Sequence, residues 1–185
     1  MTTPHYRARS TTGYTVDDLF DFPDDGYRYE IFDGSLVVTP PPPFPHARAT
    51  ANLRDRLYDQ APRHLRIIEG AGLYPNDRNY FIPDLMVIPD EVLDSGALGA
   101  QPQQTLLVVE VLSPSNPSND LVFKRELYAR HQIPEYWIVD RRNRSLTILQ
   151  LADDGKYTDR AVLHPGEVWR SDYPFPLAID PAELF

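Results

Sequence analysis

One acidic residue inside an apolar run constrains this chain more than any other feature. Residues 106–112 read Leu-Leu-Val-Val-Glu-Val-Leu, and Ser-Pro-Ser follows directly. A short, β-branched apolar run that ends at turn residues is typical of a buried strand. Glu110 therefore lies in a core strand, where an unpaired carboxylate would be strongly unfavourable. We expect a cation to compensate its charge.

A second carboxylate occurs in a similar setting upstream, in Phe81-Ile82-Pro83-Asp84-Leu85-Met86-Val87-Ile88. We expect residues 80–88 to form the strand that carries Asp84 and residues 105–112 the central strand that carries Glu110. Consecutive strands are commonly neighbours, so the two carboxylates converge if they point to one face. Such an oxygen-rich site suits Mg²⁺ or Mn²⁺. The alternative is that both are edge charges without a ligand role.

Composition limits the classes of site and partner. The 185 residues include no cysteine, which excludes disulfides and thiolate metal sites. The net charge of −9 argues against a protein that coats nucleic acid through a general basic surface. Residues 120–144 carry a local charge of +2, which is either a weak basic patch or a solvated surface. We find no membrane-spanning run and no signal-peptide core, so we expect a cytoplasmic protein without membrane contact.

Residues 27–39 predict a β-hairpin. Two β-rich runs, Tyr-Arg-Tyr-Glu-Ile-Phe and Ser-Leu-Val-Val-Thr, are joined at Asp33-Gly34. Alternation places Arg28, Glu30 and Phe32 on one face. Glu30 either pairs with Arg28 or solvent, or it belongs to a functional site. Before this hairpin we expect a polar, loose arm over residues 1–13 and a short helix after Thr15.

A helix is expected after the proline-rich connector at residues 40–45. That connector is either a rigid loop or, less simply, a ligand for a proline-recognition domain. The helix begins at His46 and continues to about Gln60, before Pro62. A histidine in the first turn of a helix is usually an ordinary polar residue, and the alternative is that His46 lies near a phosphate or a metal.

Lys124 occupies a second expected helix, which begins at Ser118 or Asn119 and ends near His131. The spacing places Leu121, Lys124 and Tyr128 on one side, so the lysine lies on or beside the core-facing stripe. It either extends its ammonium to the surface or performs chemistry. The chain contains only one other lysine, against sixteen arginines.

Strands are expected over most of the remaining chain. Residues 65–74 predict one strand with a bulge near Gly70 and Gly72, and residues 89–104 a surface excursion. Residues 134–140 and 145–151 predict a further strand and its hairpin partner. The element order predicts a single α/β (α+β) domain over residues 1–185, with a central mixed sheet flanked by helices, a core at about 16–151 and a β-rich C-terminal extension at 152–185.

Five segments together resemble the Uma-two family, which is grouped with restriction endonucleases in the PD-(D/E)XK nuclease superfamily. The order runs without interruption from about Val16 to Leu151. The segments are Tyr29-Glu30-Ile31-Phe32-Asp33-Gly34, Pro83-Asp84-Leu85, Val109-Glu110-Val111-Leu112-Ser113-Pro114-Ser115, Asp120 with Lys124 and Tyr128, and Pro134-Glu135-Tyr136-Trp137-Ile138-Val139-Asp140.

The resemblance implies a restriction-endonuclease-like core and a catalytic set of Asp84, Glu110, Lys124 and Glu30. Asp84 and Glu110 would coordinate Mg²⁺, with Mn²⁺ as a substitute, and Glu30 would be an accessory metal ligand. The superfamily lysine normally follows its acid by two positions, where this chain has Leu112. The family pattern moves that role to Lys124. His46 also matches a histidine often found at the start of the first helix.

The leading functional hypothesis is a metal-dependent endonuclease that hydrolyses DNA phosphodiester bonds. Lys124 would stabilise charge that develops on the phosphate. The alternatives are a catalytically inactive module that binds nucleic acid or protein on the same fold, and a phosphodiesterase for a smaller substrate. By analogy with enzymes that cut duplexes, we also expect a homodimer.

Overall fold

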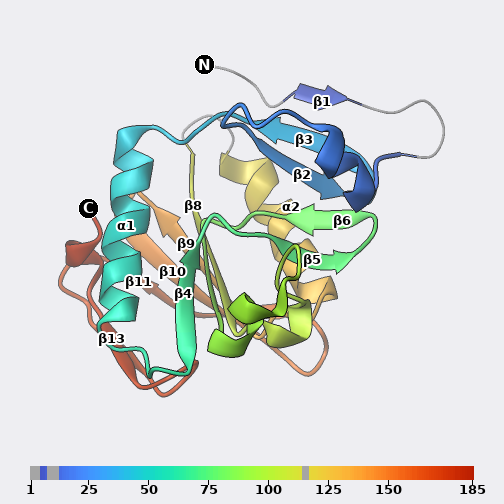
Figure 1. The fold of residues 1–185 in the computed structure, drawn as a ribbon. Helices are drawn as coiled ribbons and strands as arrows, with labels where there is room; N and C mark the ends of the chain where they lie inside the picture. The colour runs from blue at the N-terminus through green and yellow to red at the C-terminus, as the bar shows by residue number, and fades with distance from the viewer. Residues whose placement is uncertain (1–4, 8–12, 114–116) are drawn as a thin grey trace.

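The centre of the molecule is a six-stranded mixed sheet in the order β11-β10-β9-β8-β7-β4 (Figure 1). The computed structural model describes residues 5–7, 13–113 and 117–185. In it, β8 and β9 are parallel and the other neighbours in this sheet are antiparallel. The predicted mixed sheet is confirmed. Its strands are β4 (Leu65–Glu69), β7 (Leu85–Pro89), β8 (Leu107–Val111), β9 (Glu135–Asp140), β10 (Ser145–Leu151) and β11 (Tyr157–Leu163).

Two helices cover the two faces of this sheet. Helix α1 (Phe44–Tyr58) buries Ala49, Leu53 and Leu57 against one face, together with the alternate strand residues Val87 and Val109. Helix α2 (Pro117–Arg130) joins the parallel strands β8 and β9 and packs on the other face, where its residues 127–129 meet Met86 and Val108. Both helices were predicted, with ends displaced by a few residues. Within the described part of the chain, no helix is long and apolar enough to cross a bilayer.

A second, five-stranded sheet lies above the first in Figure 1, in the order β1-β3-β2-β6-β5. The predicted hairpin β2–β3 is confirmed, and Asp33 and Gly34 form its turn with φ angles of 48° and 84°. The expectation of a loose arm is wrong for residues 5–7, which pair with β3, because the edge of that strand offers unpaired backbone groups. The strands are β1 (His5–Arg7), β2 (Arg28–Phe32), β3 (Ser35–Thr39), β5 (Leu73–Asn76) and β6 (Asn79–Phe81).

The chain passes between the two sheets three times, from β3 through α1 to β4, from β4 to β5 and from β6 to β7. At the last two passages the sequence-based prediction is wrong. The single strand expected over 65–74 is split into β4 and β5, because Gly70 turns the chain with φ 61°. The single strand expected over 80–88 is split into β6 and β7 around Pro83, which lacks a backbone donor. Asp84 therefore lies at the bend that leads into β7 rather than inside a strand.

The C-terminal residues belong to the same hydrophobic core as the central sheet. Strand β11 pairs with β10, and β12 (Trp169–Ser171) pairs with β13 (Leu177–Ile179). Phe175, Leu177 and Leu184 pack in the core beneath α1. The remaining ordered turns are the 3₁₀ helices η1 (Val16–Asp21), η2 (Asp90–Ser95), η3 (Pro102–Gln104) and η4 (Pro181–Glu183).

Glu135, at the start of β9, makes the stability of this fold depend on pH. Its side chain is buried and accepts a hydrogen bond from Trp137 Nε1 at 3.0 Å. Burial raises its pKa to about 7, against the hydrogen bond and the more distant Arg160, which lower it. Because the folded pKa lies above the unfolded value, this group stabilises the fold fully below about pH 4.5 and progressively less up to pH 7.

Glu135→Gln is therefore expected to be more stable than the wild type at pH 7.5, by on the order of 2 kcal/mol, and to lose that advantage at pH 4.5. The amide oxygen can still accept from Trp137, but it carries no charge. Urea unfolding at both pH values measures the difference, with the exposed Glu126→Gln as the control. If the free energies of unfolding of wild type and Glu135→Gln change with pH in the same way, the raised pKa of Glu135 is contradicted.

Candidate active site

Strands β7 and β8 bring the two predicted acids together. Leu85 pairs with Val109 in antiparallel register, so one further step places Asp84 opposite Glu110. The carboxylate of Asp84 reaches back across the pair and accepts the N–H of Val111 at 2.9 Å. Both acids are buried, with 3% and 7% of their surface exposed. The predicted convergence of Asp84 and Glu110 is therefore present in the fold.

Asp84 is held by two basic side chains from different elements. Its Oδ1 accepts from Arg28 on β2 at 2.8 Å, and its Oδ2 lies 3.1 Å from Nε2 of His46 in the first turn of α1. Burial favours the neutral acid, but the hydrogen bonds and charges of His46 and Arg28 outweigh it and lower the pKa of Asp84 to about 2. Asp84 is therefore an anion at neutral pH.

Glu110 is held by two side chains of α2. Lys124 Nζ lies 2.8 Å from its Oε1, and the hydroxyl of Tyr128 donates to the same oxygen at 2.6 Å. Burial raises the pKa of Glu110 to about 7, opposed by Lys124 and assisted by the negative charges of Asp84 and Glu30. Ionisation of Glu110 is thus balanced near neutral pH, and added positive charge would favour it.

Lys124 lies among the acids instead of extending fully to the surface. Burial acts to lower its pKa, but the charges of Glu110 and Glu30 dominate and raise it well above the usual lysine value. The ammonium is therefore always charged in the fold. The alternative in which Lys124 simply extends into solvent does not describe its position, since its side chain is 18% exposed and bonded to Glu110.

Glu30 completes the acidic group from the second sheet. Its Oε1 accepts the backbone N–H of Ile82, beside the bend that carries Asp84, at 2.9 Å. Burial raises its pKa, opposed by Lys124, by this hydrogen bond and by Arg28. The guanidinium of Arg28 is bonded to Asp84 rather than to Glu30. The fold thus gathers all four residues expected from the sequence.

Three further residues contribute to this cluster, and the sequence assigned a functional role to none of them. Arg28 was considered only as a partner for Glu30, although alternation already put both on one face. Tyr128 follows Lys124 by one helical turn, so the spacing already placed both on one side of the helix, where both contact Glu110. His46 was interpreted first as an ordinary residue of the first turn. It is instead buried against Asp84, and Thr50 Oγ1 lies 3.5 Å from its Nδ1.

The donor set is suited to a hard divalent cation, but no complete ligand group is assembled. Among the described residues, no three or more acidic or histidine side chains are arranged to hold a metal ion. Glu110 and Glu30 each keep a second oxygen that accepts no hydrogen bond from a described residue, and neither oxygen is fully enclosed. Mg²⁺ is commonly bound by one or two carboxylates and several waters, which two such oxygens can satisfy.

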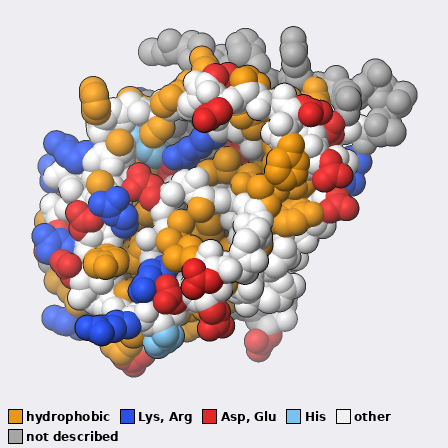
Figure 2. Space-filling view, viewed as in Figure 1, with side chains coloured by type: hydrophobic (Ala, Val, Ile, Leu, Met, Phe, Trp, Pro, Cys, Tyr) orange, Lys and Arg blue, Asp and Glu red, His pale blue; other side chains and the backbone are white. Residues whose placement is uncertain are grey.

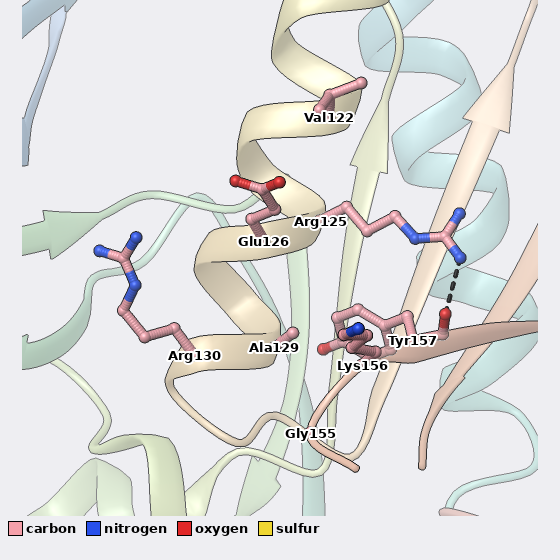
Figure 3. A pocket seen from close by; sticks show the side chains of 8 residues that line it. All are labelled: Val122, Arg125, Glu126, Ala129, Arg130, Gly155, Lys156 and Tyr157. Atoms are coloured by element: carbon pink, nitrogen blue, oxygen red, sulfur yellow. Dashed lines mark hydrogen bonds between the residues drawn. The ribbon is translucent and has the colours of Figure 1, made fainter.

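One groove lies elsewhere, along the outer side of α2 (Figure 3). It has a volume of about 480 Å³ and lies between α2 and the start of β11, where Lys156 and Tyr157 face Arg125 and Ala129. None of the four predicted site residues lines it.

Figure 2 shows a histidine beside a lysine or arginine recessed in the upper half of the visible face, while the described part of that face carries no broad basic patch.

Removal of the Tyr128 hydroxyl tests the electrostatic balance at Glu110. A hydroxyl that donates to a carboxylate favours its charged form. Tyr128→Phe is therefore expected to raise the pKa of Glu110 above about 7, by roughly one unit. Titration of the Glu110 carboxyl carbon by NMR measures the shift. Tyr157→Phe removes a buried hydroxyl bonded to Ile133 and serves as the control, which should leave Glu110 unchanged. An unchanged pKa of Glu110 in Tyr128→Phe would contradict the hydrogen bond between the two side chains.

Comparison with known proteins connects this geometry to a family. A family model named Uma2 and described as "Putative restriction endonuclease" matches residues 16–182. It therefore extends beyond residue 151, where the resemblance seen in the sequence ended. Among solved structures, a putative nuclease belonging to DUF820 from Anabaena variabilis has a TM-score of 0.71 and 16% sequence identity, and the match covers 92% of this chain and 97% of that one. The comparison with curated proteins finds no match.

Proposed function

Because this chain belongs to the Uma2 family of restriction-endonuclease-like proteins, we propose that it is a metal-dependent endonuclease that hydrolyses phosphodiester bonds of DNA. The observation that carries the proposal is the placement of Asp84 opposite Glu110, with Lys124 bonded to the second acid. Two such acids can hold a divalent cation, and a lysine beside them can stabilise negative charge on a phosphate, which are two contributions to phosphodiester cleavage. The same neighbourhood also contains Glu30.

Mg²⁺, or Mn²⁺ in its place, would be held by Asp84 and Glu110 with Glu30 as accessory ligand. When bound, such a cation polarises a phosphoryl oxygen and lowers the pKa of a coordinated water. The residues fit this role in charge and in oxygen chemistry. Asp84 is ionised at neutral pH, and the pKa of about 7 at Glu110 means that a nearby cation readily keeps this residue ionised as well.

Lys124 would bind the scissile phosphate and stabilise the negative charge that develops on it. Its ammonium stays charged because Glu110 and Glu30 hold its pKa high. Its three donors allow it to keep Glu110 and still reach a phosphate oxygen. Tyr128 holds Glu110 in position by its hydrogen bond. His46 does the same for Asp84, so that both acids are oriented before substrate binds.

A nicking assay on supercoiled plasmid tests the proposal. Wild type with Mg²⁺ or Mn²⁺ is expected to nick or linearise the plasmid, and Glu110→Gln is expected to be inactive while its thermal unfolding stays cooperative. Glu126→Gln, an exposed substitution of the same kind on α2, should cleave like the wild type. No cleavage by the wild type with either metal would contradict the proposal. Hydrolysis of a small aryl phosphodiester, but not of plasmid, would instead support the smaller-substrate alternative.

We also propose a homodimer, because cleavage of both strands of a duplex commonly uses two sites. Among the described residues, strand β11 is an edge strand of the central sheet, and an edge strand is the place where a second chain can pair. One chain has a mass of 21.2 kDa, and light scattering after size exclusion should give twice this value. A monomer at micromolar concentration would contradict this part of the proposal.

A further inference from the structure

Both carboxylate oxygens of Asp84 already accept hydrogen bonds. Arg28 occupies Oδ1, while His46 and the N–H of Val111 both approach Oδ2. Oδ1 accepts one bond and keeps room for a further partner, but a divalent cation bound there must overcome the like charge of the Arg28 guanidinium at 2.8 Å or displace it. This requirement differs from the situation of Glu110 and Glu30, whose second oxygens accept no hydrogen bond from a described residue.

Of the three donors, Arg28 is the one that can leave. The N–H of Val111 is part of strand β8 and has no freedom to turn away. His46 is 7% exposed in the first turn of α1, and Thr50 of the same helix lies next to its other ring nitrogen. Arg28 is a long, flexible side chain that comes from the other sheet, and its side chain is 24% exposed. Water can thus solvate its guanidinium as soon as it separates from Asp84.

Arg28 cannot leave by losing its proton, since a guanidinium stays charged at any physiological pH. When it leaves Asp84 it remains a cation, and it remains beside the acids: Asp84, Glu110 and Glu30 all act on its charge. A phosphate diester that enters the site is the natural new partner. A planar guanidinium binds two phosphate oxygens at once, in a geometry that an ammonium cannot match.

We propose that Arg28 is a substrate-binding residue that exchanges partners: it pairs with Asp84 until a divalent cation takes Oδ1, and it then binds the scissile phosphate. This inference rests on the proposed nuclease function and adds a residue and a sequence of contacts to it. It implies that Arg28 and the metal compete for one oxygen atom. Loss of Arg28 therefore has opposite effects on metal affinity and on cleavage.

Arg28→Met tests the exchange, because methionine keeps much of the side-chain volume without charge. Calorimetric titration with Mn²⁺ alone should give a Kd about three- to tenfold lower than that of the wild type. Plasmid cleavage at saturating Mn²⁺ should fall about 10²-fold or more. Arg28→Lys keeps the cation, so its Mn²⁺ affinity should stay near that of the wild type and part of the cleavage should remain. Arg54→Met, an exposed arginine paired with Asp55 and Glu69, is the matched control for both measurements.

The outcomes separate this inference from the function on which it rests. Tighter Mn²⁺ binding together with slower cleavage in Arg28→Met supports it. Unchanged or weaker Mn²⁺ binding, with a wild type that binds metal and cleaves, overturns the exchange and leaves the nuclease proposal intact. Undiminished cleavage in Arg28→Met also overturns it. A wild type that neither binds Mn²⁺ nor cleaves overturns both. If Arg28→Met does not unfold cooperatively, Arg28→Lys decides: full wild-type cleavage by that variant overturns the bidentate role.

Discussion

Asp84→Asn is expected to reduce metal-dependent cleavage at least ~10²-fold. The carboxylate is fixed by the β8 backbone, by α1 and by β2 at the same time. An amide keeps the shape but loses the charge, so it binds a divalent cation weakly and leaves Arg28 without its anion. We expect a cooperative fold with a loss of stability of about 1–3 kcal/mol.

Asp159→Asn is the appropriate control for Asp84→Asn. Asp159 also pairs with an arginine, Arg125, at 2.8 Å, but its side chain is 53% exposed on β11. Exposed pairs of this kind contribute little, so the control should keep wild-type cleavage and nearly wild-type stability. Equal losses of cleavage in the two variants would show a general effect of charge. Undiminished cleavage in Asp84→Asn would remove Asp84 from the site.

Lys124→Ala is expected to lower cleavage about 10²- to 10³-fold, with metal binding retained. Two effects contribute to this loss. The phosphate loses a fixed positive charge, and Glu110 loses the cation that most strongly lowers its pKa. The second effect moves the acid limb of the pH–rate profile upward, since the fraction of ionised Glu110 at pH 7 falls.

The pH–rate profile separates the two roles of Lys124. If the lysine only keeps Glu110 ionised, cleavage by Lys124→Ala should recover to the wild-type level near pH 9. We predict instead a shifted limb and a lower plateau, because contact with the phosphate is lost at every pH. Lys156→Ala, at the only other lysine of the chain, is exposed and should behave as wild type. Wild-type cleavage by Lys124→Ala at pH 7 would return Lys124 to a purely structural role.

Local signals were sufficient to predict the parts of the fold that depend on short-range rules. The Asp33-Gly34 turn requires two residues with positive φ, and both are residue types that tolerate it. The apolar run around Glu110 predicted β8, and the gathering of Asp84, Glu110, Lys124 and Glu30 followed from the family resemblance. Their placement in one cluster agrees with that expectation, while their roles remain proposals.

Features that depend on long-range packing were not predictable from local pattern. The residues on either side of Gly70 form one continuous β-type sequence, and nothing local shows that its two halves join different sheets. The bend at Asp84 has the same origin. Arg28 was missed for a related reason: its partner Asp84 lies at the bend before β7, 56 positions away in the chain, so spacing along β2 offered only Glu30. The edge pairing of residues 5–7 also required the position of β3.

The most direct test of the central claim is the calorimetric titration of Mg²⁺ and Mn²⁺ into wild type and Asp84→Asn, with plasmid nicking measured on the same samples. The claim predicts that the wild type binds metal and nicks the plasmid, and that Asp84→Asn does neither. Binding that is equal in the two proteins would place the metal elsewhere. Absence of both binding and nicking in the wild type would mean that the buried acids and their basic partners form a structural cluster only.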